Sequence, residues 1–356
     1  MFQPEIILHH YIGSPYAEKI TTALRVKGLP WYSVITSNML PRPLLEPLTH
    51  GYRRIPVMQI GNNVYCDTAV ILDELERRYP GDEAVHVSGL SDMVSAWVDK
   101  LLFGNVRDQM PWGATPEEQK ASPLHAAFGN AAFLSDRSKL SGGRPINTEA
   151  IRKAQPFLLD QLLSNLDTLE QTLQGPMETF QRHQQSPPPP AVRPVEGGWV
   201  LGTVKPSAAD ISVFGKIHWL LMTGRAPEYV NKTAYPHIFA WFSQMKAYMK
   251  IHAHPTQDRV KFTGEEALEV AKAAAARPDK GFIPTGEKVH AEEKRRVGEI
   301  VTVTPNDYGK VPVRGEIVEI TSRRVSIRPE PLNSVEVVIH FPRNGYMIVP
   351  VQKASL

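Results

Sequence analysis

The spacing of apolar residues changes twice along the 356-residue chain, and this change constrains the fold more than any other feature. Residues 1–82 alternate between short apolar runs and segments with apolar residues at helical spacing. Residues 88–255 carry long helical patterns, and residues 291–356 return to short runs of β-branched residues. We therefore expect three successive parts of α/β, all-α and all-β character, joined by a helical extension and linker over 256–290.

The first part is predicted to contain a β-α-β unit, a hairpin and a last helix. Gly28-Leu29-Pro30 ends one helical pattern, and Gly61-Asn62-Asn63 is a turn between two apolar runs. The strands of a β-α-β unit run parallel because the connecting helix crosses one face of the sheet. The predicted elements are strand 6–8, helix 15–27, strand 31–35, hairpin strands 55–60 and 64–66, and helix 69–79.

The second part, residues 88–255, is expected to be all-helical, with a proline-rich insertion near 181–198. Four consecutive prolines at 187–190 cannot continue a helix and predict an exposed polyproline-like loop. Such a run can bind an aromatic groove, but it is more often a spacer. We therefore interpret the segment as an inserted loop.

Residues 291–356 are expected to form a small β-barrel-like domain. The change of spacing falls across a proline-containing break at 278–284, where we expect few contacts between the parts. Because so short a segment buries little surface, the domain should lean on the helical part, but deleting it should leave the rest folded. The expected strands are 297–303, 315–320, 325–327, 335–341 and 346–351.

Charge and cysteine content argue against several classes of protein. The 40 Lys and Arg residues nearly balance the 37 Asp and Glu residues, so the net charge of +3 does not favour a nucleic-acid partner. No apolar run reaches the ~20 residues needed to cross a bilayer, and no basic and apolar leader precedes the first strand. The single cysteine, Cys66, cannot form an internal disulfide, and the histidine spacing indicates no metal site. We expect a cytoplasmic protein without a membrane or nucleic-acid partner.

Four short motifs carry a resemblance to a known family. With the predicted elements, they resemble the glutathione S-transferase superfamily over residues 5–255, in a serine-type, fungal-like form with an appended β-rich domain. The resemblance implies a thioredoxin-like first domain that binds glutathione, an all-helical transferase domain, and a possible homodimer. The motifs are Ser14-Pro15-Tyr16-Ala17, Arg54-Ile55-Pro56-Val57, Cys66-Asp67-Thr68 and Ser207-Ala208-Ala209-Asp210.

Ser14 is the candidate catalytic residue. It precedes a predicted helix whose N-terminal N–H groups favour a thiolate over a thiol, and Pro15 suits the first helical position. The resemblance implies that the Ser14 hydroxyl donates a hydrogen bond to the glutathione sulfur. The alternative is a plain N-cap. A serine in place of a cysteine here disfavours disulfide exchange.

The other motifs supply candidate glutathione contacts. Ile55-Pro56 resembles the pair in which the proline is cis and the preceding residue offers its backbone to the cysteinyl unit. Asp67 and Thr68 begin a predicted helix, where a hydroxyl and free N–H groups suit the γ-glutamyl carboxylate and the Asp67 carboxylate suits the ammonium. The alternative is that these two residues only cap the helix.

Basic and aromatic residues complete the predicted site. Arg42 is a candidate for the glycine carboxylate, and Arg53 and Arg54 are near enough to compete for this role. Ser207 and Asp210 are interpreted as a structural capping box, and Cys66 as a buried apolar residue. The candidates for the walls of the substrate pocket are Tyr11, Tyr16, Trp97 and Phe103.

The function that this resemblance implies is attack of the glutathione thiolate on a small apolar electrophile, with glutathione as co-substrate and no metal. One alternative is a glutathione-dependent isomerase or dehydratase of a biosynthetic intermediate, which returns glutathione unchanged. Another is a non-enzymatic interaction protein built on the transferase fold.

Overall fold

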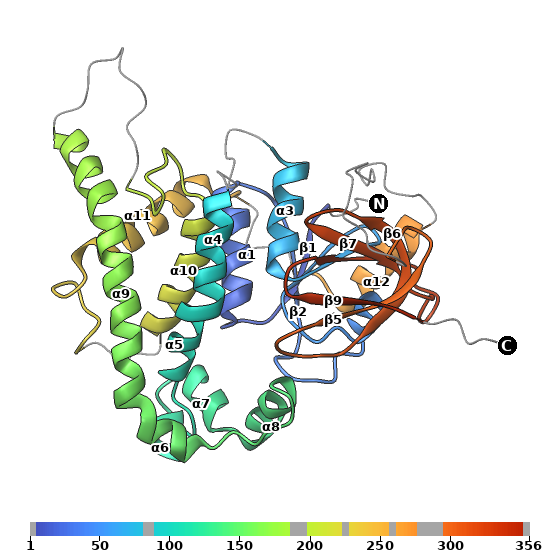
Figure 1. The fold of residues 1–356 in the computed structure, drawn as a ribbon, viewed down its shortest axis with the longest axis horizontal. Coiled ribbons are helices and arrows are strands. Elements are labelled where there is room, and N and C mark those ends of the chain that lie inside the picture. Colours follow the sequence, from blue (N-terminus) through green and yellow to red (C-terminus); the bar gives the residue numbers. More distant parts are fainter. Residues whose placement is uncertain are drawn as a thin grey trace, which may run out of the picture.

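The structure is a computed structural model in which long helices lie on one side and the strands gather on the other (Figure 1). The proline run at 187–190 and the expected linker from 276 onwards lie outside the described residues. Among the helices described, none is long and apolar enough to cross a membrane. The described residues are 5–80, 89–185 (with side chains up to 178), 198–222, 228–255, 261–275 and 295–351.

The first part has the expected thioredoxin-like arrangement. Its elements are β1 (Ile7–His10), α1 (Pro15–Val26), β2 (Tyr32–Ile35), α2 (Glu46–Thr49), β3 (Val57–Ile60), β4 (Asn63–Cys66) and α3 (Thr68–Arg78). Strand β1 pairs in parallel with β2 and antiparallel with β3, and β3 pairs with β4 across the hairpin turn. Pro15 begins α1, and Gly28, with a φ of 61°, follows its end, as the sequence predicts.

The second part is helical, as expected. Its elements are α4 (Gly89–Trp97), the π-helix η1 (Val98–Leu102), α5 (Phe103–Asp108), α6 (Pro116–Gln119), α7 (Pro123–Gly129), α8 (Ala131–Leu140), α9 (Thr148–Gln185), α10 (Ala208–Met222) and α11 (Pro236–His252). Helix α10 is buried against α1, and the missing side chain of Gly215 permits close contact, because a Cβ there would lie 3.0 Å from the carbonyl oxygen of Pro15. Helix α9 continues to Gln185, so the first residues of the predicted insertion are helical.

The strands near the C-terminus extend the sheet of the first part. They are β5 (Ile300–Pro305), β6 (Val313–Ile320), β7 (Arg324–Arg328), β8 (Val338–Pro342) and β9 (Tyr346–Pro350). The order in the nine-stranded sheet is β2-β1-β3-β4-β8-β7-β6-β5-β9, and β8 pairs in parallel with β4 so that His340 lies beside Tyr65. Five strands were predicted, but the expectation of few contacts with the rest of the chain is wrong. We call residues 295–351 the β module.

Apolar clusters cover both faces of this sheet. One joins α1, α3 and the helices of the second part. The other joins the β module to the first part, where Val57 and Val64 pack in the same cluster as Ile327 and Ile339. Helix α12 (Gly264–Ala275) lies beside the strands (Figure 1). Its Ala271 belongs to the second cluster, and its Ala267 packs with Ile7 and Val34 in a separate small cluster. The three parts therefore share their cores, and a site can form where they meet.

Candidate functional site

A cavity of about 1240 Å³ lies where the three parts meet. The first part contributes Ser14 and Thr68, the helices contribute Phe103, and the β module contributes Tyr308 and Tyr346. This volume exceeds the ~300–1,000 Å³ of typical ligand pockets, so a peptide-sized thiol and a second molecule can be accommodated together.

The structure brings nearly all of the predicted site residues to the cavity. Trp97 is the exception, because it is half-buried and packs against the helical core instead of lining the cavity. The predicted residues that line the cavity are Tyr11, Ser14, Tyr16, Arg42, Arg54, Ile55, Pro56, Asp67, Thr68 and Phe103.

Ser14 is the N-cap of α1 and lies in the cavity wall. Its Oγ accepts a hydrogen bond from the Ala17 backbone N–H at 3.2 Å, and only 4% of the residue is exposed. Gly13, with a φ of 86°, forms the turn that leads into the helix. The capping interpretation is therefore confirmed, but capping uses the oxygen as an acceptor. The hydroxyl group donates its hydrogen to no acceptor in the described part of the chain, so it can donate a hydrogen bond to a ligand in the cavity.

The peptide bond between Ile55 and Pro56 is cis, as predicted. Both residues line the cavity and precede β3, whose partner β4 leads directly to Asp67. The hairpin thus places the cis-proline turn beside the start of α3.

Asp67 caps α3 and is held from three directions. Its Oδ1 accepts from the Ala69 N–H at 3.0 Å, and its Oδ2 accepts from the Tyr346 hydroxyl at 3.1 Å and lies 3.7 Å from Nη1 of Arg54. Burial raises the pKa of Asp67, while the Ala69 N–H and the Arg54 guanidinium oppose this rise. Thr68 follows at the first position of the helix, in the cavity wall. The β module therefore contacts a residue that sequence reasoning assigned to glutathione.

The arginine next to the cis-proline turn is also engaged by the β module. Arg54 contacts the carboxylate of Asp307 and donates from Nε to the carbonyl oxygen of Tyr308 at 3.0 Å. Asp307 also accepts from Lys100 at 3.1 Å. Burial works against the ionisation of Asp307, but the Arg54 guanidinium lowers its pKa to about 2. The positive charge of Arg54 is thus balanced within the chain.

Two buried lysines, Lys19 in α1 and Lys216 in α10, share one carboxylate. Lys19 Nζ is 2.9 Å from Oδ2 of Asp99 in η1, and Lys216 Nζ is 3.5 Å from its Oδ1. The Lys216 ammonium also lies 3.5 Å from the centre of the Tyr16 ring. Burial lowers the pKa of Lys216 to about 8, although Asp99 opposes this shift. Two ammonium groups share one carboxylate, so the cluster brings an excess positive charge to the cavity that Ser14, Lys19 and Asp99 line.

Aromatic side chains of the second part form the apolar wall. Phe103 packs edge-on against Tyr16 at 4.9 Å and stacks with Trp219 at 5.9 Å. Phe128 packs edge-on against Trp112 at 4.7 Å. This wall suits a flat apolar substrate.

Sequence reasoning missed several residues of this site. No local pattern separates an aromatic residue in a cavity wall from one in a helix core, and the contacts of Asp307 and Tyr346 depend on long-range pairing. The residues missed are Lys19, Asp99, Trp112, Phe128, Arg137, Trp219, Asp307, Tyr308 and Tyr346.

Three further predictions concern Asp210, Cys66 and metals. Asp210 accepts from the backbone N–H and the hydroxyl of Ser207, each at 2.8 Å, which is one half of the predicted capping box and a structural role for this carboxylate. Cys66 is buried, and burial raises the pKa of its thiol. Among the residues that the structure describes, no group of three His, Cys, Asp or Glu side chains could hold a metal ion.

Comparisons with known proteins agree with the resemblance. Residues 8–83 match the family model "Glutathione S-transferase, N-terminal domain", and residues 196–254 match a domain of unknown function, DUF7962. No curated protein matches the chain. A solved GST-like protein from Pseudomonas syringae is 24% identical with a TM-score of 0.65, and the alignment covers 98% of this chain and 100% of that one. The fold is therefore that of a GST-like protein, including the strand-rich C-terminal region.

Two other solved structures align with a smaller share of the chain. The beta-etherase LigF from Sphingobium sp. strain SYK-6 is 17% identical with a TM-score of 0.46, and 70% of this chain and 98% of that chain are covered. A bacterial zeta-class maleyl pyruvate isomerase is 16% identical with a TM-score of 0.43, and 72% of this chain and 100% of that chain are covered.

Proposed function

Because the chain carries a glutathione S-transferase N-terminal domain, we propose that it binds glutathione and directs the thiolate onto a small apolar electrophile. The observation that carries this proposal is the position of Ser14, whose hydroxyl lies at the N-terminus of α1 in a cavity that aromatic side chains of the second part also line. The sulfur of glutathione would accept a hydrogen bond from Ser14, and the electrophile would lie against the aromatic side chains.

The groups around Ser14 favour an ionised thiol. A helix N-terminus carries about half a positive charge, and the Lys19, Lys216 and Asp99 cluster adds an excess positive charge. Lowering a thiol pKa of about 8.5 by two units requires about 2.7 kcal/mol, which a helix terminus and a charge-assisted hydrogen bond can supply. The thiolate then forms a carbon–sulfur bond, and the leaving group departs with its bonding electrons.

The remaining predicted residues would hold the peptide. The backbone of Ile55 before Pro56 would bind the cysteinyl unit, and Asp67 and Thr68 the γ-glutamyl end. Arg42 is the remaining candidate for the glycine carboxylate, because Arg54 is engaged by Asp307 and Arg53 by Asp136. A cytoplasmic location and a homodimer are part of this proposal, and cell fractionation and analytical ultracentrifugation would check them.

Two alternatives are supported by particular contacts. The β module adds Tyr308 and Tyr346 to the cavity lining, which suits a specialised substrate and thus an isomerase or dehydratase that returns glutathione. The contacts of Arg54 with Asp307 and of Asp67 with Tyr346 occupy polar groups expected to bind glutathione, which favours a non-enzymatic interaction protein.

Calorimetric titration with glutathione, followed by mass spectrometry of products from candidate electrophiles, tests the proposal. A transferase binds glutathione and yields a glutathione conjugate. An isomerase binds glutathione and yields a product of unchanged mass, or lighter by water for a dehydratase. Absence of binding would exclude both activities and leave the interaction protein.

A further inference from the structure

Three arginines and one carboxylate meet where α8 approaches the loop after β2. Arg53 donates from Nη2 to Oδ1 of Asp136 at 2.7 Å, and Arg137 donates from Nη2 to Oδ2 of the same carboxylate at 2.8 Å. Arg42 donates from Nη1 to the carbonyl oxygen of Arg53 at 2.7 Å and from Nε to that of Ser37 at 2.8 Å. All three arginines line the cavity. We call Arg42, Arg53 and Arg137 the arginine cluster.

The arginine cluster has an excess of positive charge. The Asp136 carboxylate pairs with Arg53 and Arg137, and no ion pair is found for Arg42 among the described residues, so three positive charges share one carboxylate there. Burial lowers the pKa of Arg42, and the guanidinium groups of Arg137 and Arg53 lower it further, against the opposing effects of Tyr11 and Asp136. The Nε of Arg137 is buried without a hydrogen-bond partner in the described part of the chain. The Arg53 and Arg137 side chains are only 10% and 18% exposed, and guanidinium groups so far removed from water are stabilised by a nearby negative charge, so the cluster favours an anion in the cavity.

The other arginines of the cavity wall are balanced within the chain. Arg54 contacts Asp307, Arg107 donates to Asp108 at 2.8 Å, and Arg323 lies 3.0 Å from both Asp73 and Asp92. Among the arginines that line the cavity, the uncompensated charge is therefore concentrated at α8.

The arginine cluster adjoins the aromatic wall. The Arg137 guanidinium lies 4.8 Å from the centre of the Phe133 ring, and Phe133 packs edge-on against Phe128 at 5.4 Å. A molecule whose ring lies against Phe128 can therefore place an attached carboxylate at Arg137.

We propose that Arg42, Arg53 and Arg137 form an oxyanion-binding subsite for the second substrate, which is an aromatic or otherwise apolar electrophile that carries a carboxylate. The inference rests on the proposed function, because it names the substrate class of the same cavity. The glycine carboxylate of glutathione would balance one of the two excess charges, and the carboxylate of the electrophile balances the other.

A matched pair of electrophiles tests the subsite. Glutathione displaces chloride from neutral 1-chloro-2,4-dinitrobenzene and from anionic 4-chloro-3,5-dinitrobenzoate by the same addition and loss of chloride. After division by the uncatalysed rate of each compound, we expect kcat/KM to favour the benzoate by ~10-fold or more, as for one charge-assisted hydrogen bond. Arg137→Gln and Arg42→Gln should each abolish most of this preference, and Arg137→Lys should retain part of it.

Arg107→Gln is the matched control, because it removes a cavity arginine whose charge Asp108 already balances. This variant should keep the preference for the benzoate. The proposal would be overturned if the wild-type protein had equal corrected kcat/KM values for the two electrophiles. It would also be overturned if the preference for the benzoate survived Arg137→Gln and Arg42→Gln. If these variants weaken only the binding of glutathione and leave the preference unchanged, the oxyanion is the glycine carboxylate and the proposal is wrong.

A binding measurement separates this inference from the proposed function. If neither electrophile is turned over, quenching of tryptophan fluorescence by 3,5-dinitrobenzoate and by neutral 1,3-dinitrobenzene still reports on the subsite. The benzoate should bind the full chain ~10-fold more tightly, and Arg137→Gln should remove the difference. Equal affinity of the wild-type protein for both compounds would contradict the subsite.

Discussion

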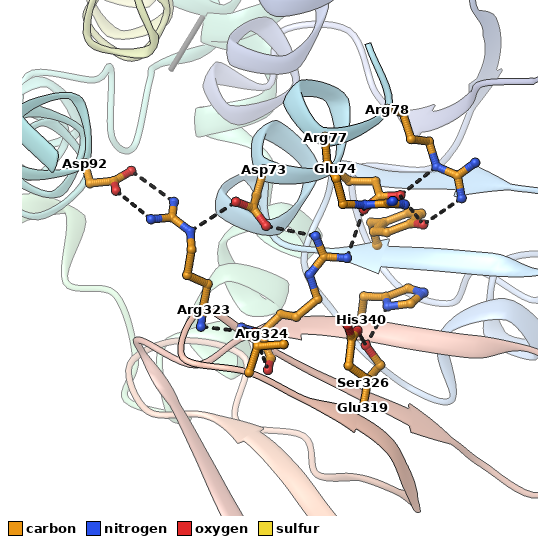
Figure 2. Close-up of polar contacts among 12 residues, drawn as sticks. Asp73, Glu74, Arg77, Arg78, Asp92, Glu319, Arg323, Arg324, Ser326 and His340 are labelled. Atoms are coloured by element: carbon orange, nitrogen blue, oxygen red, sulfur yellow. Dashed lines mark hydrogen bonds and ion pairs between the residues drawn. The ribbon is translucent and has the colours of Figure 1, made fainter. Parts of the chain in front are cut away.

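Arg324 at the start of β7 donates from Nη1 to Oε2 of Glu74 in α3 at 2.9 Å, although the two residues are 250 positions apart. Glu74 is completely buried and also accepts from Arg77 at 2.6 Å and from Arg78 at 2.6 Å (Figure 2). The second Arg324 nitrogen, Nη2, lies 2.9 Å from Asp73. This buried charge cluster joins the β module to the first part of the chain.

Glu74→Gln is expected to destabilise the protein. The substitution removes a carboxylate that three guanidinium groups contact, and breaking a buried ion pair typically costs about 3–5 kcal/mol. Chemical denaturation at pH 7 measures the free energy of unfolding. Glu149→Gln is the control, because Glu149 is 77% exposed and forms an exposed pair with Lys153 on the same helix, so a loss below ~1 kcal/mol is expected. If both variants lose the same free energy of unfolding, the buried charge cluster stabilises the fold no more than an exposed ion pair does.

Acid should destabilise the protein in two steps. Burial lowers the pKa of His340 to about 3 and those of His9 and His10 to about 4, so the folded state keeps them neutral. Their contribution to stability is complete above their unfolded pKa of about 6.5 and is lost as the pH falls towards 3–4. Burial opposes the ionisation of Glu74, but its arginine partners lower its pKa to about 2, so its contribution is lost only below about pH 4.5.

Denaturant unfolding between pH 7.5 and pH 4.5 checks the first step. Each of the three histidines should contribute about 1.4 kcal/mol per pH unit to the slope of stability against pH below 6. The ring of His340 is hydrogen-bonded to Ser326 at 2.7 Å and to Asn63 at 3.0 Å, so His340→Gln should lower stability at pH 7.5 and also reduce this slope by about 1.4 kcal/mol per pH unit. An unchanged slope in the variant would show that His340 does not titrate on unfolding.

The local elements of the fold could be predicted from the sequence, but the joining of its parts could not. Alternating apolar residues and a Gly61 turn predict the hairpin of β3 and β4, because a hairpin depends only on neighbouring residues. The parallel pairing of Asn63 with Val338 depends on two strands with a long stretch of chain between them. A buried strand presents the same apolar pattern whether its neighbour lies in the same domain or elsewhere.

The candidate site shows the same division. Ser14, Pro56 and Thr68 belong to short motifs whose order and spacing resemble a family, so sequence alone could place them together. Asp307 and Arg137 approach the cavity only because the β module and α8 fold back over the first part. No local signal marks such residues, since a solvated surface charge is the usual interpretation of each.

Deleting the β module is now expected to unfold the protein, contrary to the prediction from sequence. Removal of residues 291–356 would expose the β4 edge that pairs with β8 and one face of the apolar cluster that contains Val64 and Ile339. A truncated chain should lose its cooperative unfolding transition, as followed by circular dichroism. A truncated chain that unfolds cooperatively and binds glutathione would restore the original prediction.

Lys216→Met should weaken the stabilisation of the bound thiolate. The substitution removes one of the two ammonium groups that share Asp99, so the pKa of the glutathione thiol should rise by about 1. Ultraviolet difference spectra of the thiolate measure this pKa in the binary complex. Lys272→Met, on the surface of α12, is the control and should leave it unchanged. If the pKa of the bound thiol is the same in both variants, Lys216 does not stabilise the thiolate.

Ser14→Ala should raise the pKa of bound glutathione and lower turnover, while affinity for glutathione stays within a few-fold. The hydroxyl is the proposed donor to the sulfur, and a hydrogen bond to a charged group contributes about 1.5–3 kcal/mol. The substitution also removes the N-cap bond to Ala17, at a cost of about 1 kcal/mol in stability. Thr115→Ala separates the two effects, because Thr115 caps α6 in the same way but does not line the cavity. That control should lose similar stability and keep full turnover, whereas unchanged turnover and thiol pKa in Ser14→Ala would leave Ser14 with its capping role alone.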